Sequence, residues 1–403
     1  MTLLEMKHKY AYTLARVGLN VQKGQIVVVE AAIEGYEFTP IFAEECYKLG
    51  ASNVIINYLD NANLKVRAHY TPVEVMEKVD DVEKAYYEYY MDQGAAFCRL
   101  EGVNPLQMAD MPEAESNAVF KRTDNVRNIM RKYTRNHCQW LIAMIPTQEW
   151  ADYILPNKED NLTELWNLLF KLCYIDEEND VVKTWEEKNE RKNALGDKMD
   201  ALQLRKLHYT ASNGTDLTVE LTPDSFFGFS RFRKMLPANY VKTNCNIPTE
   251  EICTSPEKYG TNGVVYASRP LVLGGKAVEN FGFRFENGKV VEVIAEEGKE
   301  MLESLVATDE GAAYLGEAAL VEYHSPISMS GLVYYTTLID ENASCHLALG
   351  RALGSGQPSD PNYTFNNSQI HIDFMVGTPD MSIIGTDVNG AEHVIFKDGD
   401  FAI

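Results

Sequence analysis

A histidine and an aspartate near the C-terminus are spaced to form half of a metal site. In His371-Ile-Asp373 the imidazole and the carboxylate stand two residues apart. On an extended strand, residues i and i+2 point to the same side, so both groups would project toward one point. A hydrogen-bonded pair on the surface is the alternative interpretation of so short a pattern.

A second histidine follows a run of helix-capping residues. The stretch from Asp340 through His346 to Gly350 begins with residue types common at helix N-caps and ends at a glycine. The spacing predicts a short helix over 341–352 that carries His346. Asn342, four residues earlier, would share its face and could hydrogen-bond to the imidazole. A lone helical histidine in a core or on a surface is the alternative.

Two acidic clusters could supply further metal ligands. Glu250 and Glu251 follow Pro248, which predicts a loop or a strand edge, and Glu317 follows a glycine that allows close backbone approach. Each carboxylate could equally be a helix cap or a solvated charge. Three carboxylates (Glu251, Glu317 and Asp373) and two imidazoles match the mixed oxygen and nitrogen donors that Zn, Mn or Co accept in a two-metal site. Spacing alone leaves open whether the five converge.

The elements that must position these residues show different sequence patterns in the two halves of the chain. The first half alternates helical and strand patterns: helices over 3–18, 37–49, 72–92, 114–135 and 160–206, and strands over 25–31, 52–59 and 138–145. A strand, a helix and a second strand in succession indicate a right-handed crossover and a parallel sheet. After about residue 207, short strands alternate with turn signals, and helices are expected near 297–306 and 309–315.

At 403 residues the chain is too long for one hydrophobic core. We therefore predict an α/β protein of two domains. Residues 1–200 would form a Rossmann-like α/β domain with a parallel sheet, and residues 201–403 a β-rich α+β domain that binds metal and carries the catalytic site.

Composition excludes several classes of function. A formal net charge of −22 argues against nucleic acid and anionic membranes as partners, because binding to phosphates requires clustered Lys and Arg. The N-terminus lacks the pattern of a signal peptide and no apolar run could span a bilayer, so a cytoplasmic location is expected. The seven cysteines are odd in number with no Cys-x-x-Cys, which disfavours a disulfide framework or a zinc knuckle. Dinucleotide-binding loops, phosphate-binding loops and nucleophile elbows are also missing.

The sequence resembles the aminopeptidase T and aminopeptidase S family of metallo-aminopeptidases over most of its length. Seven blocks occur in order and carry the resemblance: Arg16-Val-Gly-Leu-Asn-Val-Gln-Lys-Gly-Gln25, Pro146-Thr-Gln-Glu-Trp-Ala151, Gly214-Thr-Asp-Leu217, Asn246-Ile-Pro-Thr-Glu-Glu251, Leu315-Gly-Glu-Ala-Ala-Leu-Val321, Thr337-Leu-Ile-Asp-Glu-Asn342 through His346, and His371-Ile-Asp373.

The resemblance implies that the candidate ligands converge on two adjacent metal ions. Carried over by motif, the ligands are Glu251, Glu317, His346, His371 and Asp373. The implied activity is release of N-terminal amino acids from short peptides by water that the two ions activate. A homodimer with its active sites facing an internal cavity is also implied.

From the residues we predict that Glu317 bridges the ions and that Glu250 serves as general base or as partner of the substrate amine. One position departs from the family pattern: Leu353 stands where the family usually has a tyrosine, and Tyr334 or Tyr335 could replace it. This departure motivates the alternative of a catalytically weakened metal- or peptide-binding protein. A two-metal phosphoesterase is a further alternative, disfavoured because no basic phosphate clamp accompanies the motifs.

Overall fold

The computed structural model describes residues 1–102, 110–134, 138–228, 240–273, 276–353 and 357–403. Contacts divide the chain into two units, and the division falls between Glu186 and Glu187, inside helix α9 (Val181–Leu202). A later passage that includes strand β7 (Asn246–Ile247) returns to the first unit. The expected bounds 1–200 and 201–403 remain a prediction about independently folding domains.

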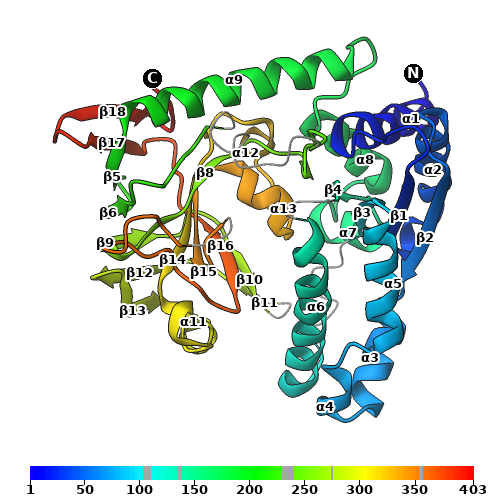
Figure 1. Ribbon diagram of the computed structural model, residues 1–403, viewed down its shortest axis with the longest axis horizontal. Helices are drawn as coiled ribbons and strands as arrows, with labels where there is room; N and C mark the ends of the chain where they lie inside the picture. Colours follow the sequence, from blue (N-terminus) through cyan, green and yellow to red (C-terminus); the bar gives the residue numbers. More distant parts are fainter. Residues whose placement is uncertain (103–109, 135–137, 229–239, 274–275, 354–356) are drawn as a thin grey trace. The chain divides into compact units, whose positions relative to one another are not determined.

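The first unit is built on a parallel sheet, as the sequence predicted. Its strand order is β2-β1-β3-β4-β7, and every neighbouring pair is parallel. Strands β1 to β4 are labelled in Figure 1. The strands are β1 (Ile26–Ala32), β2 (Asn53–Leu59), β3 (Ala96–Glu101), β4 (Trp140–Met144) and β7. Their apolar runs suit strands that are covered on both faces. Strand β3 had no counterpart among the predicted elements.

Helices precede and connect these strands. They are α1 (Leu3–Thr13), α2 (Thr39–Lys48), α3 (Asn61–Tyr70), α4 (Val73–Met76), α5 (Asp81–Asp92), α6 (Glu113–Thr134), α7 (Gln148–Ile154) and α8 (Asn161–Leu172). Helix α1 begins with a reciprocal cap in which Thr2 and Glu5 each accept a backbone N–H. Helix α5 packs Tyr87 and Met91 against Val28 and Phe97 of the sheet. The alternation of strands and helices is therefore confirmed.

The second unit contains two antiparallel sheets. The larger has the order β13-β12-β9-β6-β5-β17-β18-β19 and the smaller β16-β15-β14-β8. The larger sheet comprises β5 (Leu204–Thr210), β6 (Asp216–Leu221), β9 (Pro256–Tyr266), β12 (Phe281–Glu286), β13 (Lys289–Ala295), β17 (Ser382–Asp387), β18 (Glu392–Lys397) and β19 (Asp400–Phe401). The smaller comprises β8 (Ile252–Thr254), β14 (Leu315–Leu320), β15 (His346–Gly350) and β16 (His371–Met375).

Shorter elements complete this unit. Strands β10 (Leu271–Leu273) and β11 (Lys276–Val278) pair with each other. The helices are α11 (Lys299–Val306), α12 (Pro326–Met329), α13 (Thr337–Asp340) and two 3₁₀ turns at Glu310–Ala313 and Glu341–Ala343. None of the described helices combines the length and apolar character needed to cross a membrane.

The hydrophobic core of the second unit contains residues from both sheets. The ring of Phe281 in β12 is tilted against that of Phe374 in β16, with the ring centroids 6.2 Å apart. Phe283 of β12 packs edge to face against the same ring, with the centroids 5.2 Å apart. Leu347 and Leu349 of β15 belong to the same core. Since side chains alternate along a strand, the residues between these apolar ones must face the opposite side of the smaller sheet.

The predicted helix over 341–352 is wrong. Only Glu341–Ala343 form a 3₁₀ turn, and His346 begins strand β15. The run Leu347-Ala-Leu-Gly350 is short and apolar, and periodicity cannot distinguish a buried helix from a buried strand in so few residues. In the structure this run pairs on both sides, with β14 and with β16.

Candidate metal centre

The candidate ligands lie on the face of the smaller sheet that points away from its hydrophobic core. Strand β16 places His371 and Asp373 on that face while Phe374 faces the core. On β15, His346 alternates with core residues in the same way. The pair predicted from His371-Ile-Asp373 therefore lies on a strand and on one side of it, as the two-residue spacing indicated.

A β-bulge in β14 aims Glu317 at the same face. The pairing of β14 with β15 shifts register between Leu315 and Glu317, so one extra residue is accommodated there. That residue is Gly316, where an added Cβ would come 2.3 Å from the carbonyl oxygen of Arg351. Because the bulge changes the alternation, Leu315 and Ala318 both lie in the core and Glu317 lies opposite.

Small residues leave room between the polar side chains. Glu317 pairs with Ala348, and Ala348 pairs with Asp373, so the two carboxylates flank a methyl group across three strands. Ala319 pairs with His346 on one side and with Cys253 of β8 on the other. Opposite positions on neighbouring strands have Cβ atoms about 5 Å apart, so their side chains can share a ligand.

The two carboxylate oxygens of Glu317 approach different histidines. Oε2 lies 2.9 Å from Nε2 of His371, and Oε1 lies 4.0 Å from Nε2 of His346. The same imidazoles contact two other acids: His371 Nε2 is 3.4 Å from Asp373 Oδ1, and His346 Nε2 is 3.3 Å from Glu251 Oε2. All five predicted ligands are thus brought together, although they come from four separate segments.

These five form two groups with the spacing of metal ligands. In each group, one donor atom per residue lies within 4.8 Å of the others: Glu251, Glu317 and His346 in one, and Glu317, His371 and Asp373 in the other. Glu317 belongs to both. Imidazole and carboxylate donors in this ratio suit borderline divalent ions.

Hydrogen bonding orients His371 for such a role. Its Nδ1 lies 2.6 Å from the carbonyl oxygen of Arg351 and therefore donates to it. The lone pair of a neutral imidazole is then on Nε2, which faces Glu317 and Asp373. Asn342 does not have the role predicted for it, because it bonds to the backbone of Glu250 and Leu338 and not to His346.

Glu341 is a further carboxylate that interacts electrostatically with the candidate ligands, and it was not among the predicted site residues. Burial raises its pKa well above the ordinary value, and the charges of Asp373 and Glu251 raise it further. The charges that shift the pKa of Glu341 are thus those of the candidate ligands. The available signal was its position in the Asp340-Glu-Asn342 block, to which we assigned a cap and no chemistry.

The crowding of acids fits a divalent cation. Burial raises the pKa of Glu317, and although a hydrogen bond from His371 lowers it, the net shift is upward. Within the described residues, Nδ1 of His346 and Oδ1 of Asp373 are buried without a hydrogen-bond partner. A bound cation would neutralise the carboxylates, and buried oxygen atoms such as Oδ1 of Asp373 could coordinate it.

Comparison with known proteins places this arrangement in a family. The profile of the thermophilic metalloprotease (M29) family matches residues 5–401. The chain belongs to the thermophilic metalloprotease (M29) family. This confirms the resemblance drawn from the seven sequence blocks, and membership implies a divalent metal.

Individual M29 relatives cover nearly the whole chain. It is 36% identical to aminopeptidase AmpS of Bacillus subtilis, across 98% of this chain and 97% of that protein. It is 33% identical to aminopeptidase 2 of Geobacillus stearothermophilus, across the same shares of the two chains. The solved structure of AmpT from Thermus thermophilus superposes with a TM-score of 0.87 at 30% identity and covers both chains fully. The two-part α/β fold is thereby confirmed.

Histidine protonation gives a pH test of this candidate metal centre. Burial alone would lower the pKa of His346, but the hydrogen bond and charge of Glu251, with Asp373 and Glu317, raise it to about 10. The pKa of His371 is likewise raised, by Asp373 and Glu317, against the effect of burial. Both imidazoles are therefore protonated at neutral pH when no metal is bound, and a metal must displace these protons.

We expect metal binding to metal-free protein at pH 8 to release two or more protons per chain, one from each imidazole and others from carboxyl groups with raised pKa, and to strengthen as the pH rises toward 10. Calorimetric titration with Zn²⁺ in buffers of different ionisation enthalpy measures the number released. His371→Gln should release about one proton fewer. Heats that do not depend on the buffer would contradict this assignment.

Other residues singled out from the sequence are Glu250, Leu353 and Tyr334. Glu250 pairs with Lys188 and is treated below. The side chain of Leu353 is 41% exposed, and it follows β15 at its C-terminal end. Tyr334 is buried, and burial raises its pKa to about 12 although Ser330 lowers it.

A third group of possible ligands, His8, Glu44 and Glu45, differs from the two groups of the candidate metal centre. Lys48 already lies 2.9 Å from a carboxylate oxygen of both glutamates. Its ammonium group supplies the positive charge that a metal would bring. We therefore assign no metal to this group.

Proposed function

We propose that this chain is an aminopeptidase whose centre holds two divalent ions, Zn, Co or Mn. Glu251, Glu317 and His346 would hold one ion, and Glu317, His371 and Asp373 the other. The observation that carries the proposal is the sharing of Glu317 by both ligand groups, with one carboxylate oxygen toward each histidine. The named aminopeptidases among its M29 relatives support the reaction.

Charge balance supports two ions and not one. Four carboxylates gather at the centre, namely those of Glu251, Glu317, Glu341 and Asp373. Two divalent ions would neutralise the four negative charges. One ion would leave two of these charges unbalanced, so the pKa values of Glu317 and Glu341 would stay above the ordinary value. We therefore include Glu341 among the residues that hold the ions.

When bound, the ions would supply an activated water and polarise the scissile carbonyl group. The strongly negative net charge of the chain would favour substrates that carry a free ammonium group, that is, peptides with a free N-terminus. Short peptides as substrates, a homodimer and a cytoplasmic location stay predictions. Light scattering of the purified protein tests the dimer.

Hydrolysis assays test the function. Metal-free protein should not cleave leucyl p-nitroanilide, and addition of Co²⁺, Zn²⁺ or Mn²⁺ should restore cleavage in proportion to metal content up to about two ions per chain. Acetylated leucyl p-nitroanilide is the control substrate, because it lacks the free amine. If the protein held two ions and cleaved neither peptides nor anilides, the alternative of a catalytically weakened binding protein, motivated by Leu353, would be correct.

A further inference from the structure

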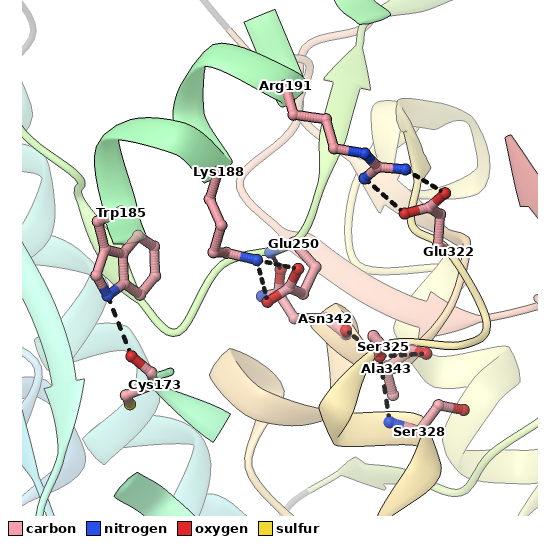
Figure 2. Close-up of polar contacts among 10 residues, drawn as sticks. All are labelled: Cys173, Trp185, Lys188, Arg191, Glu250, Glu322, Ser325, Ser328, Asn342 and Ala343. Carbon is pink, nitrogen blue, oxygen red and sulfur yellow. Dashed lines mark hydrogen bonds and ion pairs between the residues drawn. The ribbon is translucent and has the colours of Figure 1, made fainter. Parts of the chain in front are cut away.

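Helix α9 directs two lysines, one turn apart, toward the segment that precedes β8. Lys188 Nζ lies 2.8 Å and 3.1 Å from the two carboxylate oxygens of Glu250 (Figure 2). The two side chains are only 18% and 11% exposed. Burial lowers the pKa of Lys192, and the nearby charge of Glu250, with a smaller effect from Glu251, raises it. The ammonium group of Lys188 thus pairs with this acidic segment, and Lys192 interacts with it electrostatically.

Glu250 is also fixed through its backbone. Its N–H donates to Oδ1 of Asn342 over 2.6 Å, and Asn342 is fully buried. The amide nitrogen of Asn342 donates in turn to the carbonyl of Leu338, 3.0 Å away. Glu250 is therefore held by α9 through its side chain and by the turn that carries Glu341 through its main chain.

That turn has supports of its own. The hydroxyl of Ser325 lies 3.4 Å from the carbonyl oxygens of Asn342 and Ala343 and accepts from the N–H of Ser328 (Figure 2). The anchor for Glu250 is therefore a fixed part of the fold. Because Glu251 is the next residue, the position of its backbone depends on both attachments of Glu250.

We propose that Lys188 is a positioning residue of the metal centre, which acts through Glu250 to hold Glu251 where its carboxylate meets His346. This inference rests on the proposed function, because it assumes that Glu251 holds a metal. It gives Glu250 a role other than the general base predicted from sequence: both of its oxygens already accept from an ammonium group. Residues that orient metal ligands typically change metal affinity by 10- to 100-fold when they are lost.

The test compares metal affinity with turnover. Lys188→Met should raise the Kd for the more weakly bound Zn²⁺ by roughly 10- to 100-fold, measured by competition with a chromogenic chelator. Its kcat at saturating metal should stay within a few-fold of the wild type. Lys188→Arg should restore most of the affinity. Arg191→Met is the matched control, because Arg191 lies on the same helix and pairs with Glu322 through two contacts of 2.7 Å.

Glu250→Gln separates the two roles. Positioning predicts a raised Kd and a nearly normal kcat at saturating metal. A general base predicts an unchanged Kd, a kcat lowered by about 10²-fold or more and a lost limb of the pH profile, and that result would overturn the proposal.

The double variant Lys188→Met/Glu250→Gln removes both charges and should bind metal no more weakly than Lys188→Met alone, because the two residues act as one unit. It also carries the test if the single lysine variant does not fold. An unchanged Kd in the folded variants would overturn the proposal too. Since Kd is measured without substrate, the inference can be tested even if the wild type hydrolyses nothing.

Discussion

Replacing Glu317 by glutamine should lower kcat/KM for leucyl p-nitroanilide by roughly 10³-fold or more. Glutamine keeps the shape of the side chain but presents one carbonyl oxygen and one NH₂ group, so it cannot offer an oxygen to both histidine-bearing groups. The oxygens of Glu317 lie 2.9 Å from the imidazole of His371 and 4.0 Å from that of His346. Loss of the carboxylate should therefore weaken metal binding in both ligand groups. Metal content should fall below two ions per chain.

A stability measurement separates this effect from misfolding. Glu317 is 4% exposed and its pKa is raised, so the metal-free protein pays to bury its charge. Glu317→Gln should therefore leave the Tm of metal-free protein unchanged or higher, while it abolishes the rise in Tm on metal addition. Glu322→Gln is the control, because this half-buried carboxylate lies beyond the end of β14 and pairs with Arg191. Activity retained in Glu317→Gln would refute the bridging assignment.

Replacing Glu341 by glutamine should lower kcat/KM by about 10²-fold at limiting metal. The change removes one of four negative charges that would balance two divalent ions, so the second ion should bind more weakly. The pKa of Glu341 is raised by burial and by Asp373 and Glu251, which shows how closely these groups interact in the absence of metal. Excess Zn²⁺ or Co²⁺ should recover part of the activity.

Metal content and rate, measured together, check this role. A ligand role predicts that the second ion is lost in parallel with activity. Glu310→Gln is a suitable control, because this glutamate lies in a 3₁₀ turn next to β14 and belongs to neither ligand group. Full metal content combined with full activity in Glu341→Gln would exclude Glu341 from the centre.

Local patterns in the sequence predicted much of this fold and part of the site. The parallel sheet followed from apolar runs such as Ile26–Ala32 alternating with helical periodicity. The shared direction of His371 and Asp373 followed from their spacing on a strand. In these cases one short segment contains all the information, because the alternation of side chains is a local property.

The features that were missed depend on contacts between distant segments. His346 was assigned to a helix because its capping residues are local, whereas the strand is stabilised by pairing with β14 and β16. Asn342 was paired with His346 on helical spacing, and it instead binds Glu250. That the ligands converge was implied by the family resemblance, since nothing in the spacing of residues 251 to 373 could show it.

The bulge at Gly316 makes the chain sensitive to insertion and deletion in a way that substitutions would not reveal. The strand follows one phase of alternation before Gly316 and the opposite phase after it. Deleting this single glycine would leave one regular alternation, with Leu315 still in the core and Glu317 still opposite, whereas deleting Ala318 would turn either Glu317 into the core or Leu320 out of it. Loss of Ala318 should therefore damage folding and metal binding together, while loss of Gly316 should keep Glu317 on the face that carries the histidines.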